Sequence, residues 1–122
     1  TPSVSSHVDA ADSTWDAVQA GIRRVVTDGS AKSVFAGSPV EVAGKTGTAQ
    51  QSKSHPNHAL FMGYAPYESP QIAIAIRIAN GYTSANAASM AADIFSYYFD
   101  LTDKDELLNG SATTATSAVI ND

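Results

Sequence analysis

Hydrophobic residues recur at two spacings along the chain, first that of a helix and then that of a strand. Over residues 13–26 an apolar side chain returns every three or four positions, which predicts a helix with one apolar stripe made by Trp15, Val18, Ile22 and Val25. Ser13 is its expected N-cap, and Asp28-Gly29 is expected to end it. Residues 31–35 are expected to add a short helical turn.

The spacing changes to two after Pro39, which predicts three consecutive strands over residues 40–50, 59–65 and 72–78. In the third strand, isoleucines alternate with alanines and Arg77. We expect the β-branched isoleucine face to be buried and the flat alanine face to suit close packing against a helix or inside a larger sheet. Arg77 has either Glu41 or only solvent as its expected partner.

A second helical pattern follows Asn80-Gly81. Ser84 or Asn86 is expected to cap a helix that runs to Phe99, with a buried stripe of Ala87, Ala91, Ile94, Phe95 and Tyr98. Short connections between consecutive strands favour antiparallel pairing. The sequence therefore predicts an α+β fold, a three-stranded antiparallel meander with an N-terminal and a C-terminal helix packed on it.

The length of 122 residues suits one small domain. We divide the chain into a flexible leader (1–12), a folded region (13–101) and a polar tail (102–122). The net charge is -5 and the seven basic residues form no cluster, which disfavours nucleic-acid binding. No stretch approaches the ~20 apolar residues of a membrane span, so the chain is expected to be soluble.

Several kinds of chemistry are disfavoured by the residue types present. The absence of cysteine excludes a thiol nucleophile and a disulfide framework. His55 and His58 flank Pro56 without an accompanying carboxylate or cysteine pattern, so no metal site is expected. No glycine-rich phosphate or dinucleotide loop occurs, and no cofactor is expected.

The most distinctive chemistry belongs to Lys45-Thr46-Gly47-Thr48, within the first expected strand. Side chains in a strand repeat every two residues, so the hydroxyls of Thr46 and Thr48 share a face and can reach one ligand. Gly47 lets another group approach the opposite face, and the Lys45 ammonium can neutralise a carboxylate. An edge strand here could also offer a backbone N–H as half of an oxyanion hole. A Lys-Thr-Gly triplet by itself is more typical of an ordinary strand end.

The wider context of this triplet resembles a known family. Residues 15–99 resemble the C-terminal part of the transpeptidase domain of class B penicillin-binding proteins, most closely the cell-elongation type. The matching segments are residues 31–37, 42–50 and 58–66, the isoleucine strand and Asn80-Gly81. The resemblance implies a partial β-lactamase/transpeptidase-like fold and a role in peptidoglycan cross-linking in the parent protein.

The resemblance also implies a role for each residue of the Lys45 segment. Lys45 would supply positive potential, while Thr46 and Thr48 would bind the carboxylate of a terminal D-alanine or of a β-lactam. Gly47 would keep the strand open to the substrate. The backbone N–H of Thr48 would be one of two oxyanion donors.

Two motifs that complete the family's site are not matched. No serine is followed three residues later by lysine, since in Ser30-Ala31-Lys32 the lysine comes one residue too early. Ser84-Ala85-Asn86 has the Ser-x-Asn pattern, but it follows the Lys45 segment, whereas the family's motif precedes it. We therefore expect a D,D-transpeptidase fragment that is inactive alone.

Two alternatives remain open at this point. The chain could be a non-catalytic binding or dimerisation module built on the same sheet, or part of a β-lactamase or β-lactam sensor, although Thr48-Ala49-Gln50 favours a transpeptidase. The implied partners are peptidoglycan stem peptides, β-lactams, the rest of the transpeptidase domain and, through exposed strand edges, a second copy. The parent would be extracytoplasmic and anchored in a membrane.

Overall fold

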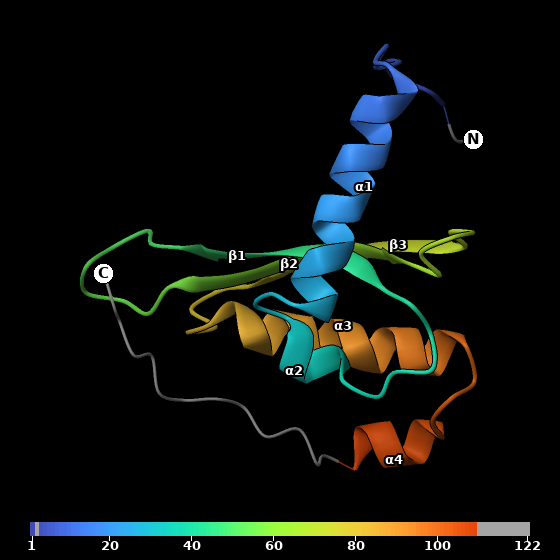
Figure 1. Cartoon of the computed structure of the whole chain (residues 1–122). Coiled ribbons are helices and arrows are strands. Elements are labelled where there is room, and N and C mark those ends of the chain that lie inside the picture. The colour runs from blue at the N-terminus through green and yellow to red at the C-terminus, as the bar shows by residue number, and fades with distance from the viewer. Residues whose placement is uncertain (2, 110–122) are drawn as a thin grey trace.

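A computed structural model describes residue 1 and residues 3–109 (Figure 1). Its elements, in chain order, are α1 (Asp12–Thr27), α2 (Lys32–Phe35), β1 (Ala43–Ala49), β2 (His58–Ala65), β3 (Ile72–Ile78), α3 (Ser84–Tyr98) and α4 (Lys104–Leu108). The predicted order of helix, three strands and helix is confirmed. The short helix α4 falls within the predicted tail, while residues 110–122 lie outside the described residues.

The three strands form one antiparallel sheet in the order β1-β2-β3. Lys45 of β1 lies opposite Met62 of β2, which lies opposite Ala75 of β3. The predicted α+β meander is therefore confirmed, and β1 and β3 are its two edges. The first strand is shorter than predicted, because residues 40–42 and 50 lie outside β1.

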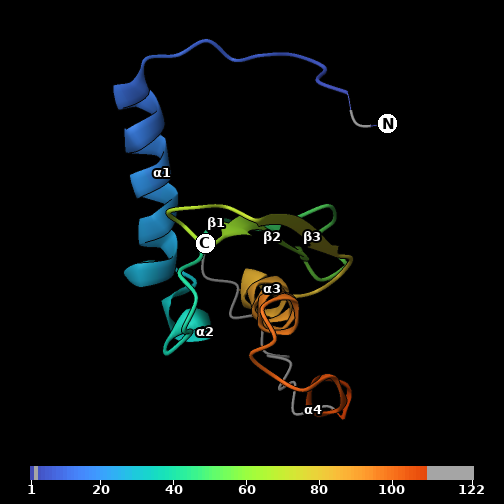
Figure 2. The same ribbon diagram turned by 90° about the vertical axis from the view of Figure 1, so that its right-hand side faces the viewer.

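In the part of the chain that the structure describes, helices cover one face of this sheet. Figure 2 shows α2 and α3 on the same side of the strands, with α1 standing against the β1 edge. Among the described residues, α3 contacts all three strands, whereas α1 contacts only β1 of the sheet. The opposite face, which carries Met62 and Ala75, is exposed.

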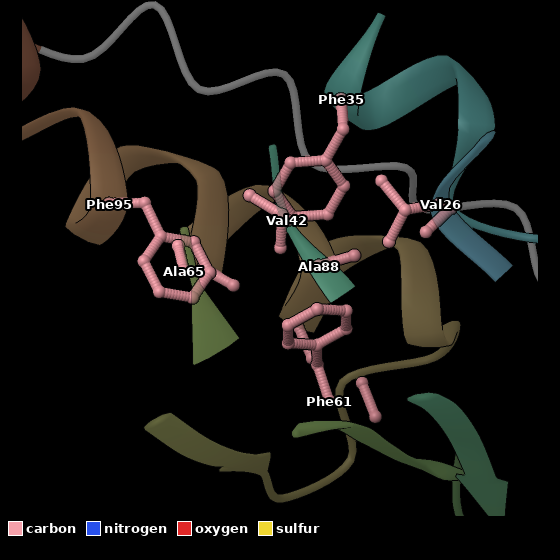
Figure 3. Close-up of a cluster of buried hydrophobic side chains, with 11 residues drawn as sticks. Val26, Phe35, Val42, Phe61, Ala65, Ala88 and Phe95 are labelled. Carbon is pink, nitrogen blue, oxygen red and sulfur yellow. The ribbon is translucent and has the colours of Figure 1, made fainter. Parts of the chain in front are cut away.

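The core lies between the sheet and its helices. Phe61 of β2 and Phe35 of α2 pack with their ring centroids 5.7 Å apart, and Val42 and Phe95 join them (Figure 3). Helix α3 faces the strands with small side chains, because Ala87, Ala88 and Ala91 are fully buried. Small residues at a helix surface permit close approach to the strands, so bulk in this core comes mainly from aromatic rings.

The burial expected for β3 is only half right. Its isoleucines pack against the core from the helix side, but they are half-buried, and the alanine face is exposed. The reason is that β3 is an edge strand with helices on one side only. Arg77, on the exposed face, does not pair with Glu41. Its guanidinium lies 3.2 Å from His58 Nε2, and Glu41 pairs instead with Arg23 at 2.8 Å.

The stripe and cap predicted for the first helix are partly wrong. Trp15 and Val18 are 41% and 51% exposed, because only the C-terminal turns of α1 reach β1 and α2, where Val26 is buried. The N-cap is Ala11, with no side-chain hydrogen bond, rather than Ser13.

The stripe and cap predicted for the last helix also need correction. Thr83 is the N-cap, and its side chain accepts a hydrogen bond from the backbone N–H of Ala85. Ile94 and Tyr98 are 37% and 48% exposed, since α3 turns its alanines and Phe95 to the sheet.

None of the helices formed by the described residues combines the length and hydropathy needed to cross a bilayer.

Helix α1 is fastened to the start of β1 by Arg23, which donates to Val42 O at 2.7 Å and to Glu41 Oε1 at 2.8 Å. We expect Arg23→Met to lower the free energy of unfolding by about 1.5–3 kcal/mol, because a charge-assisted bond to a carbonyl is lost. Glu41→Gln should cost under ~1 kcal/mol, because Glu41 is exposed. Urea unfolding of the two variants measures the difference, and equal losses would contradict this assignment to the carbonyl bond.

Gly44 in β1 leaves no room for a side chain, since a Cβ there would lie 2.5 Å from Phe61 Cζ and 2.7 Å from Met62 O. Gly44→Ala is expected to destabilise the protein by roughly 1–3 kcal/mol through overpacking. Gly21 provides the control, because a Cβ at this helical position meets nothing within 4 Å. Gly21→Ala should stabilise by about 0.5–1 kcal/mol, so opposite shifts of the thermal midpoint are expected.

Candidate functional site

The Lys45-Thr46-Gly47-Thr48 segment lies entirely within the edge strand β1. Lys45 lies opposite Met62 on the exposed face of the sheet, and Thr46 lies opposite the buried Phe61 on the helix side. Alternation then places Gly47 on the exposed face and Thr48 on the helix side. The segment therefore offers its hydroxyls and its ammonium from opposite faces of one strand.

The backbone groups of β1 alternate between β2 and the free edge. Val42 O turns away from β2, because it accepts the Arg23 guanidinium, and Thr46 O accepts Lys45 Nζ at 2.7 Å. In β2, the carbonyl oxygen of Ala65 accepts a hydrogen bond from the backbone N–H of Gln71, so Ala65 turns its backbone groups toward β3 and not toward β1. The same alternation directs the N–H and C=O of Thr48 to the free edge of β1. This edge therefore presents the backbone N–H of Thr48 near the Lys45 ammonium group.

The two threonine hydroxyls, equivalent in the sequence pattern, are in different surroundings. Thr48 is exposed. Thr46 is only 8% exposed, and its Oγ1 lies 2.6 Å from Ser30 Oγ, on the loop between α1 and α2. The partners are separated by 16 positions. No sequence pattern links them, so the contact of Ser30 was not predicted.

A shallow groove of about 360 Å³ runs beside this segment on the exposed side of the sheet. Its lining combines the cations Lys45 and Arg77 with Gly47, Leu60, Met62 and Ala75. The absence of a side chain at Gly47 keeps the groove open, because a Cβ there would lie 3.2 Å from Leu60 Cβ.

His58 opens β2, one residue before the predicted start of this strand, and joins two loops at the far end of the site. Its Nδ1 accepts from the Asn80 backbone N–H at 3.0 Å, which requires the ring proton to lie on Nε2. Nε2 lies 2.6 Å from Gln51 Oε1 and donates to it. Both ring nitrogens are therefore occupied in holding the loops. Among the residues that the structure describes, no three histidines, cysteines or carboxylates gather where they could hold a metal.

Two shifted pKa values lie outside the Lys45 segment. Burial raises the pKa of the Tyr64 phenol, with further contributions from Tyr67 and Glu68. Burial also raises the pKa of the Asp93 carboxyl on α3. Neither group adjoins the threonine hydroxyls in sequence or register, so the chemistry of the segment rests on its geometry and on the charge of Lys45.

Comparison with known proteins gives one consistent family. Residues 1–98 match the model described as the penicillin binding protein transpeptidase domain. The chain is 33% identical over 103 residues to peptidoglycan D,D-transpeptidase MrdA of Haemophilus influenzae, covering 70% of this chain and 16% of that protein. It is 31% identical over 119 residues to penicillin-binding protein 2A of Bacillus subtilis, covering 86% of this chain and 17% of that protein.

Solved structures show the same relationship. The crystal structure of Pseudomonas aeruginosa PBP2 in complex with WCK 5153 superposes with a TM-score of 0.70 and 35% identity, covering 84% of this chain and 24% of that one. The complex of PBP2 and MreC from Helicobacter pylori gives a TM-score of 0.66 and 28% identity, covering 73% of this chain and 17% of that one.

The chain thus spans about a sixth of the length of the curated relatives, 16% and 17% of the two named above. The family match covers most of its folded residues, and the motifs that carried the resemblance lie within the matched range. The chain therefore belongs to the penicillin-binding protein transpeptidase family, within the class B branch of the cell-elongation type that its motifs indicated.

Proposed function

We propose that this chain supplies the carboxylate-binding strand of a peptidoglycan D,D-transpeptidase, and that Lys45, Thr46, Gly47 and Thr48 form its substrate-binding segment. The ligand would be the terminal D-alanine of a stem peptide, or a β-lactam that takes its place. Family membership supports the reaction class, and a relative at 33% identity is named as a peptidoglycan D,D-transpeptidase.

The ligand carboxylate would be held by hydroxyl donors and a nearby cation. An ionised carboxylate only accepts hydrogen bonds, so its partners must be donors. Thr48 is exposed on the helix side of β1, with Thr46 two residues before it. The Lys45 ammonium, 2.7 Å from Thr46 O, lies at the same strand edge and adds favourable charge.

The backbone N–H of Thr48 would stabilise the developing oxyanion when the acyl carbonyl is attacked. Such a donor stabilises the transition state by ~3 kcal/mol. The observation that carries this role is the alternation of β1. It turns the Thr48 N–H to the free edge, where Thr46 O already accepts from Lys45. A peptide-like ligand laid along this edge would meet the N–H, the hydroxyls and the ammonium together.

The nucleophile and the second oxyanion donor would come from residues other than those of this chain. No Ser-x-x-Lys motif occurs in the sequence. We therefore infer that residues 13–101 act as one part of a larger transpeptidase domain, whose remainder is their principal partner. The parent protein would be anchored in a membrane and face the cell wall.

A second candidate function, a non-catalytic module that dimerises through a strand edge, rests on β3. This strand has seven residues and ends the sheet. Its isoleucines are half-buried, and no described residue pairs with its outer edge. Unpaired strand edges can pair with another chain.

The purified chain is expected to form no covalent adduct with a fluorescent penicillin, because it lacks the Ser-x-x-Lys nucleophile. The measurement is intact mass after incubation and denaturation. A stoichiometric adduct would contradict this expectation. Ser30→Ala and Ser84→Ala variants would then test the two serines closest to a family motif.

The dimerisation candidate predicts a discrete dimer by size-exclusion chromatography with light scattering. Ala75→Lys, which places a charge on the exposed β3, should convert the dimer to a monomer, because charged side chains block edge pairing. Ala20→Lys adds the same charge on the exposed part of α1 and should leave the dimer intact. A monomeric wild-type chain would reject this candidate.

A further inference from the structure

A pair of hydroxyls joins the Lys45 segment to the loop between α1 and α2. Ser30 Oγ lies 2.6 Å from Thr46 Oγ1, at the short end of the range for O–H···O hydrogen bonds. We propose that Ser30 is a positioning residue, which fixes the Thr46 hydroxyl as a donor to the ligand carboxylate. The proposal rests on the carboxylate-binding role of β1 and names a residue outside that strand.

Ser30 is held in place by its neighbours in the main chain. The N–H of Gly29 bonds to Arg24 O at 2.9 Å, and that of Ala31 to Val25 O at 3.1 Å. A Cβ at Gly29 would lie 2.9 Å from Val25 Cα, so glycine permits this tight turn. Ala31 is completely buried in the core. Ser30 therefore projects from a fixed point after α1.

The hydroxyl pair is not the main attachment between α1 and β1. Arg23 of α1 already donates to Val42 O, one residue before β1, with a distance of 2.7 Å. Removing the Ser30 hydroxyl is therefore expected to leave β1 in place. What it removes is the constraint on the direction of the Thr46 hydroxyl.

The direction of this hydrogen bond decides whether Thr46 can serve a carboxylate. A threonine hydroxyl has one proton, and a carboxylate offers none. If Ser30 donates to Thr46 Oγ1, the Thr46 proton remains for the ligand. The hydrogen bonds then run from Ser30 to Thr46 to the carboxylate, and each polarises the next.

The test combines side-chain geometry with ligand binding in the whole chain. Three-bond couplings report the χ1 rotamer of Thr46 in the wild type, Ser30→Ala and Ser30→Thr. NMR titration with N-acetyl-D-alanyl-D-alanine, and with its C-terminal amide, reports whether the carboxylate is recognised. Ser33→Ala is the matched control, because it removes an exposed hydroxyl from the adjacent α2.

We expect a single Thr46 rotamer in the wild type and averaging in Ser30→Ala. Ser30→Ala should weaken binding of the carboxylate ligand by roughly threefold to tenfold, while leaving any binding of the amide unchanged. Ser30→Thr should restore both the rotamer and the affinity, and Ser33→Ala should change neither. A purely structural hydroxyl would affect both ligands equally.

The failures of the two proposals are distinguishable. Carboxylate binding by the wild type that is unchanged in Ser30→Ala would overturn the role of Ser30 and leave the role of β1 standing. A wild-type chain that does not prefer the carboxylate ligand to its amide would overturn both. A Thr46 rotamer that is unaffected by Ser30→Ala would reject positioning whatever the affinities.

Discussion

The attachment of α1 to the outer edge of β1 determines what that edge can present. Arg23 of α1 donates to Val42 O, one residue before β1 begins. Ser30, on the loop that follows α1, contacts the side chain of Thr46, so these two contacts lie on either side of Lys45. Because Arg23 uses a carbonyl that points away from β2, the same alternation leaves the Thr48 N–H facing outward. An edge strand that a helix secures at one end can stay open at the other without depending on a further strand.

Among the described residues, the helices cover one face of the sheet and leave the other face exposed. Helix α3 lies against the strands through alanines and Phe95, and α2 adds Phe35 to the same layer. The other face carries Met62, which is 60% exposed, and the alanines of β3. In a chain that spans about a sixth of its curated relatives, such a face is consistent with a role as part of a larger domain.

The sequence predicted the elements well where local pattern decides them. The alternation of isoleucine and alanine defines β3 to the residue, and the change of period after Pro39 identifies the strands. Burial depends instead on which neighbours are present. Trp15 and Val18 have helical spacing, yet they lie beyond the reach of the sheet. Ile94 and Tyr98 are exposed because α3 turns its alanines and Phe95 to the sheet instead.

The candidate site shows the same division between local and long-range information. Strand alternation was sufficient to place Thr46 and Thr48 on one face, since that relation is set by adjacent residues. It could not distinguish their surroundings, because the partner of Thr46 belongs to a loop fixed by Gly29 and Ala31. The predicted pairing of Arg77 with Glu41 was wrong for a similar reason. Glu41 forms its ion pair with Arg23 of α1, and Arg77 lies beside His58. The types of donor group in the site could be inferred from the short Lys45 motif. The direction in which each of these groups points depends on contacts between segments that are distant in sequence.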